Sequence, residues 1–170
     1  MTKKIIYAKS TKQEYRKFLA VVGFIFVTAT LMSTLISFRW EDWIRWYLGS
    51  SLLVFGGFKL ISFDSFSQVF PRYDPLAAKY SWYAFAYPIA QVMLGGFFIL
   101  DIAPGFRNLL TAAMGIFGLI SMVTNLERQG PSAQNTWLGH VLRLPMSTAL
   151  LFEDGMIAAF ATILLIAGIF

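Results

Sequence analysis

Long apolar segments separated by short polar ones constrain this 170-residue chain more than any other feature. We expect five membrane spans, near residues 18–38, 44–63, 81–100, 106–126 and 146–170. About 20 residues of helix cross roughly 30 Å of hydrocarbon, so each segment is long enough to span a bilayer. The sequence therefore predicts an all-α membrane protein, a bundle of about five transmembrane helices that forms a single domain over residues 18–170.

The composition agrees with a membrane protein, because 57% of the residues are apolar and 14% are charged. A soluble domain would carry charge on about a quarter of its residues. The chain has 14 basic and nine acidic residues. In a membrane protein this excess indicates topology first, and no basic stripe points to nucleic acid. The expected surroundings are a lipid bilayer and other membrane subunits, with no nucleic-acid partner.

The basic residues also predict an orientation. Residues 1–17 form a basic arm that contains six of them: Lys3, Lys4, Lys9, Lys12, Arg16 and Lys17. Basic loops stay in the cytoplasm, so we expect the arm and the segments 64–79 and 127–145 on that side. The C-terminus then lies on the outer face of a bacterial inner (cytoplasmic) membrane.

Aromatic residues gather between the first two predicted spans. Trp40, Trp43, Trp46 and Tyr47 alternate there with charged residues. This mixture is typical of an aromatic belt in an interfacial turn at the level of the lipid headgroups. A nucleic-acid stacking platform has a similar composition, but the position between two spans favours the belt.

Lys59 in the second predicted span and Glu153 and Asp154 in the fifth form the most informative group of ionisable residues, and all three lie near the predicted cytoplasmic ends of their helices. Such residues usually find partners or water. We expect a structural ion pair between Lys59 and one of the two acids, with Asp154 favoured. A proton or ion site, or a polar substrate pocket, is the alternative. Small-residue faces around Gly56 and Gly155 are expected to dock the two helices together.

Other sites have weaker signals. The chain has no cysteine, which excludes thiolate metal sites and disulfides within it, and its single histidine, His140, makes an imidazole metal site improbable. The sequence requires no cofactor and leaves a quinone, a haem or a pigment open. At Tyr73-Asp74-Pro75 we expect a turn in which Asp74 accepts backbone N–H bonds. No catalytic constellation is recognised, so an enzyme is not the favoured reading.

Three stretches in order along the chain, LLVFGGFKLISFDSF (52–66), YDPLAAKYSWYAFAYPIAQVMLGG (73–96) and LGHVLRLPMSTALLFEDGMIAA (138–159), carry a family resemblance. Together they resemble the MauE/DoxX-like family of bacterial membrane proteins. The resemblance implies a link to redox maturation or to electron-transfer enzymes. Many relatives carry a C-x-C-L-G element just before the third stretch. Here Asn135 and Trp137 fill both thiol positions, so a role that runs through this pair is lost.

The leading hypothesis is therefore a non-catalytic accessory or scaffold subunit of a larger, redox-linked membrane complex. A quinone-facing or redox-associated subunit of an enzyme is the second hypothesis, and it rests on the family analogy. A small transporter is the third, prompted by Lys59, Glu153, Asp154 and by a proline in the third predicted span. No inverted repeat is visible in the sequence to support it.

Overall fold

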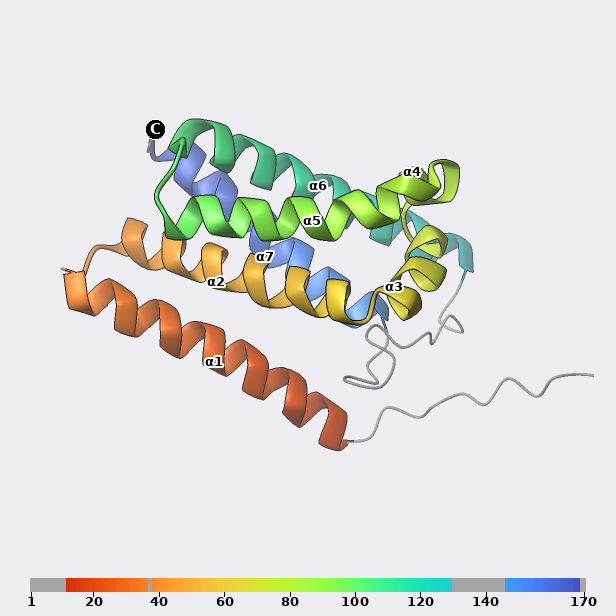
Figure 1. The fold of residues 1–170 in the computed structure, drawn as a ribbon, viewed down its shortest axis with the longest axis horizontal. Helices are drawn as coiled ribbons and strands as arrows, with labels where there is room; N and C mark the ends of the chain where they lie inside the picture. Colours follow the sequence, from red (N-terminus) through yellow and green to blue (C-terminus); the bar gives the residue numbers. More distant parts are fainter. Residues whose placement is uncertain (1–11, 37, 130–145, 169–170) are drawn as a thin grey trace, which may run out of the picture.

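A computed structural model describes residues 12–36, 38–129 and 146–168, and the regular structure within these ranges is helical (Figure 1). There are five long helices: α1 (Lys12–Ile36), α2 (Trp40–Ile61), α5 (Ser81–Ile99), α6 (Pro104–Gln129) and α7 (Met146–Ile166). Short helices join α2 to α5: α3 (Phe63–Val69), the 3₁₀ helix η1 (Phe70–Arg72) and α4 (Pro75–Lys79). The predicted all-helical membrane bundle is confirmed.

Within the described ranges, four helices are each long and apolar enough to cross a membrane as a single helix: α1, α5, α6 and α7. A fifth crossing is formed if α2 is taken together with Phe63–Arg72, which is bent by 93° relative to it. The described ranges therefore contain four or five candidate spans, as expected of a multi-pass membrane protein. Pro88 lies inside α5 without ending it, as neighbouring helices in a bundle allow.

The long helices pack in pairs. α6 lies along α7 and α5 lies along α2, while α7 also meets α2 and joins the two pairs. α1 packs mainly on α2 at the edge of the bundle. In Figure 1 the described start of α1, the short helices α3 and α4, the end of α6 and the start of α7 all lie at one end. The α1–α2 and α5–α6 connections lie at the opposite end.

Glycines mark the closest helix contacts. A Cβ at Gly115 of α6 would lie 2.6 Å from the backbone nitrogen of Ala158 in α7, and one at Gly95 of α5 would lie 3.0 Å from the backbone nitrogen of Leu53 in α2. The expected docking of α2 on α7 through small residues is wrong. Gly56 packs against α5, and a Cβ at Gly155 of α7 would meet Leu119 of α6 at 3.8 Å.

The aromatic residues expected in an interfacial turn belong to the first two turns of α2, because the helix already begins at Trp40. Trp40 is exposed. Trp43 stacks on Tyr47 with ring centres 5.4 Å apart, and its indole N–H donates to Thr30 Oγ1 at 3.0 Å. Tyr47 is buried, while Trp46 is half-buried beneath the Arg45 guanidinium. Trp43 and Tyr47 therefore pack α2 against its neighbours instead of reaching outward.

Candidate functional site

Five polar side chains from three helices meet inside the bundle. We call Lys59 of α2, Tyr87 and Gln91 of α5, and Glu153 and Asp154 of α7 the buried polar cluster. Each of the five residues is at most 4% exposed. Buried charges in a membrane protein are costly unless they are paired, so their contacts decide what the cluster can do.

Lys59 lies at the centre of the cluster. Its ammonium approaches Glu153 Oε1 at 2.5 Å and donates to Gln91 Oε1 at 2.7 Å. The same nitrogen lies 5.1 Å from the ring centre of Tyr87 and 5.9 Å from that of Phe66. A carboxylate, an amide oxygen and two aromatic faces thus replace the water that this cation would otherwise need.

Gln91 connects the cation to the acid. Its amide N–H donates to Glu153 Oε1 at 2.6 Å, while its own oxygen accepts from Lys59. The three side chains therefore form a closed ring of contacts that joins α2, α5 and α7. The other oxygen of the carboxylate, Glu153 Oε2, is buried without a hydrogen-bond partner among the described residues.

Asp154 has a different environment from Glu153. Tyr87 donates its hydroxyl to Asp154 Oδ1 at 3.1 Å, and Asp154 Oδ2 points at Gly118 of α6. The sequence favoured Asp154 as the partner of Lys59, but the structure gives the short contact to Glu153. Consecutive helical residues point about 100° apart, so one acid faces α2 and α5 while the next faces α6.

A small cavity of about 10 Å³ separates the cluster from the short helices. Asp154 and Tyr87 line one part of it, and Tyr73 and Asp74 line another. Asp74 caps α4 by accepting from the backbone N–H groups of Leu76 at 2.8 Å and Ala77 at 2.9 Å. The expected Asp74 turn is therefore confirmed. Burial raises the pKa of the Asp74 carboxyl, and the two backbone hydrogen bonds oppose that rise.

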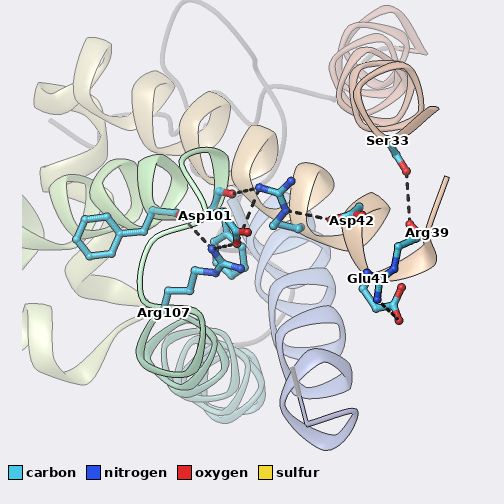
Figure 2. A network of polar contacts seen from close by, with 9 residues as sticks. Ser33, Arg39, Glu41, Asp42, Asp101 and Arg107 are labelled. Atoms are coloured by element: carbon cyan, nitrogen blue, oxygen red, sulfur yellow. Dashed lines mark hydrogen bonds and ion pairs between the residues drawn. The ribbon is translucent and has the colours of Figure 1, made fainter. Parts of the chain in front are cut away.

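A second polar group, which sequence reasoning missed, lies at the opposite end of the bundle. We call Asp42, Arg45, Asp101 and Arg107 the arginine cluster, and Figure 2 shows Arg107 beside Asp101. Arg107 is 1% exposed and lies 2.7 Å from Asp101 Oδ1. Arg45 lies 3.5 Å from Asp42 and 4.0 Å from Asp101. The sequence signal was available, since Asp101 and Arg107 flank the α5–α6 turn.

The two arginines cap the C-terminus of α5. Arg107 donates to the carbonyl of Phe97 at 3.1 Å and Arg45 donates to that of Phe98 at 3.2 Å. Carbonyls in the last turn of a helix have no partner within the helix, and a cation there complements the helix dipole. The following turn places Asp101 and Ala103 at φ 56° and 45°, a region that residues other than glycine rarely adopt. The arginine cluster therefore fixes a strained turn.

The comparison with known families decides what kind of protein this is. The chain matches the family model described as methylamine utilisation protein MauE over residues 32–167. The chain belongs to the MauE family. No curated protein and no solved structure matches it. Both polar clusters lie within the matched region.

Three residues singled out in the sequence of this MauE-family chain lie outside the described ranges: Asn135, Trp137 and His140. The loss of both thiol positions thus rests on the sequence alone. Within the described ranges, no group of three His, Cys, Asp or Glu side chains could hold a metal ion. The buried polar cluster is therefore the candidate functional site among the described residues. It combines an ion pair, a second acid and a phenol.

Proposed function

We propose that this chain is a non-catalytic accessory subunit of a larger, redox-linked membrane complex. The observation that carries the proposal is the closure of the buried polar cluster. Lys59, Gln91 and Glu153 are at most 1% exposed and bind one another across three helices. A site that binds and releases a substrate needs an opening and polar groups left over for the ligand. These polar groups instead tie helices together, as a structural subunit requires.

Family membership supplies the redox context. The family is described as that of a methylamine utilisation protein, and the resemblance noted in the sequence implies a link to redox maturation or to electron-transfer enzymes. With no cysteine in its 170 residues, the chain has no dithiol chemistry of its own to contribute. The absence of a dithiol supports an accessory role beside a redox enzyme.

The outer face of α1 is the surface we assign to a partner subunit. The apolar stretch of this helix is only 17% buried, although it packs on α2. Its large exposed side chains include Phe24, Val27, Leu31 and Leu35. A helix of another membrane protein can cover this face through side-chain packing.

The proposed location is the bacterial inner membrane, with the N-terminus in the cytoplasm and the C-terminus outside. The arrangement in Figure 1 supports this orientation. The start of α1, which overlaps the end of the basic arm, lies at the same end as the connection that contains Arg72 and Lys79. Basic segments on one side of a membrane are the usual sign of its cytoplasmic face.

The test is gentle detergent extraction of the tagged chain from its native membrane, followed by native mass analysis. We expect a complex with at least one other integral membrane protein. Gly23→Leu on α1 should weaken this complex, whereas Gly96→Leu on α5 is the matched control, since an added Cβ meets nothing within 4 Å at either glycine. A monodisperse monomer without a partner would contradict the proposal.

A quinone-facing subunit is the second candidate, favoured by one further observation. A groove of about 500 Å³ runs between α1 and α2, and its lining is apolar: Ala20, Val21, Phe24, Leu53, Val54, Gly57, Phe58 and Ile61. An isoprenoid tail would suit such a lining. Gly57→Leu adds bulk at a position where a Cβ meets nothing. It should lower the quinone recovered by solvent extraction of the purified protein if this candidate holds.

A further inference from the structure

The buried polar cluster contains two acids and one cation. Glu153 and Asp154 are neighbours in α7, and both are at most 3% exposed. Lys59 of α2 supplies the positive charge. α5 contributes Gln91 and the phenols of Tyr83 and Tyr87, none of which is a cation. The part of α6 that meets Asp154 offers Gly118 and Ser121.

If both acids were ionised, the cluster would carry one uncompensated negative charge in the interior of a membrane bundle. An unpaired charge in that setting is costly, and the group neutralises itself instead. Two carboxylates that share one site also destabilise each other when both are ionised, because each disfavours the charge of the other. Binding one proton removes both the unpaired negative charge and the repulsion between the two carboxylates.

We propose that Glu153 and Asp154 together bind one proton, which Asp154 carries while Glu153 stays ionised against Lys59. The ligand of the site is thus a proton. This goes beyond the accessory role proposed above and does not depend on it. The cluster is then neutral as a whole.

The hydrogen bonds assign the proton to Asp154. Glu153 Oε1 receives both the Lys59 ammonium and the Gln91 amide, and such donors favour the ionised form of a carboxylate. Among the described residues, the Tyr87 hydroxyl donates to Asp154 Oδ1 at 3.1 Å. The second oxygen of Asp154 points toward Gly118 of α6. Asp154, which accepts from fewer donors and does not make the close contact with Lys59, is the acid that stays protonated.

The small cavity places a second carboxyl group near Asp154. It is lined by Asp154 on α7, by Asp74 at the start of α4, and by Tyr73 and Ser121. Its volume of about 10 Å³ is close to what a single water needs. A water there would lie beside the carboxyl groups of Asp154 and Asp74, both of which are buried.

Infrared spectroscopy of the purified full-length chain in lipid nanodiscs tests the proposal, because a protonated carboxyl has a carbonyl stretch separate from that of a carboxylate. At neutral pH we expect this band in the wild type, and we expect it to shift after transfer to D₂O. Asp154→Asn should abolish it. Absence of the band in the wild type, its survival in Asp154→Asn, or the lack of a shift in D₂O would overturn the proposal.

Glu153→Gln provides an independent arm. In this variant Asp154 is the remaining acid that can balance the charge of Lys59. Asp154 should therefore ionise, and the carbonyl band of the protonated carboxyl should again disappear. A band that survives in a folded Glu153→Gln protein would contradict the shared-proton account. Asp101→Asn is the matched control: this aspartate is exposed and lies at the far end of the bundle, so the band should be unchanged.

Discussion

Gln91 donates its side-chain amide to Glu153 Oε1 at 2.6 Å, the same oxygen that the Lys59 ammonium approaches at 2.5 Å. One uncharged residue of α5 therefore holds both members of the ion pair between α2 and α7. The cluster thereby adds a polar constraint on the rotation of α7 to the one that the close packing of α6 on α7 provides.

Replacing Gln91 by leucine should destabilise the protein. The substitution leaves Lys59 and Glu153 each with one hydrogen bond fewer in a buried site, which typically costs about 1–3 kcal/mol. Gln68→Leu is the matched control, because Gln68 of α3 is exposed and its loss should cost less than about 0.5 kcal/mol. Chemical unfolding in detergent, followed by circular dichroism, gives the comparison. Equal stability of the two variants would mean that the ring of contacts contributes nothing.

The α6–α7 contact makes a separate prediction. In Gly115→Ala the new Cβ would lie 2.6 Å from the backbone of α7, so the helices must separate, at a cost of about 1–3 kcal/mol. In Gly96→Ala the Cβ meets nothing within 4 Å, and alanine favours a helix over glycine by about 1 kcal/mol. The midpoints of thermal unfolding should therefore move in opposite directions. A shift in the same direction would contradict the close α6–α7 approach.

The proposed orientation can be tested with single cysteines, since the chain has none of its own. A cysteine at Ser10 in the basic arm should react with a membrane-impermeant maleimide only after the cells are permeabilised. A cysteine at Glu41, in the first turn of α2, should react in intact cells. Labelling of position 10 in intact cells would show that the N-terminus lies outside, which contradicts the proposed orientation.

Helices α1, α5, α6 and α7 were predictable because each is long and apolar enough to span a membrane by itself. The rarity of charge inside such spans also singled out Lys59, Glu153 and Asp154. The choice between the two acids was not predictable, because it depends on the rotation of α7 about its axis. That rotation is set by contacts such as Gly115 against Ala158, which involve a helix distant in sequence.

Gln91 was missed for a related reason. An uncharged polar residue in a span has no signal in composition, and its role appears only when α5 is placed beside α2. The predicted packing of α2 on α7 through small residues was also wrong. Gly56 indicates that another helix can approach this face of α2 closely, but it does not indicate which helix does so. Arg107 was missed as well, because its role as a cap of α5 depends on its neighbours at the α5–α6 turn.

The most direct test of the account is a double-mutant cycle between Lys59 and Glu153, measured by chemical unfolding in detergent. Lys59→Met should cost roughly 3–5 kcal/mol, because it leaves a buried acid without its cation. Lys79→Met, which removes an exposed lysine, is the control and should cost less than about 0.5 kcal/mol. The account predicts that Lys59→Met combined with Glu153→Gln is more stable than the sum of the two single effects by at least about 1 kcal/mol. Strict additivity of the two substitutions would show that the pair does not hold α2 and α7 together.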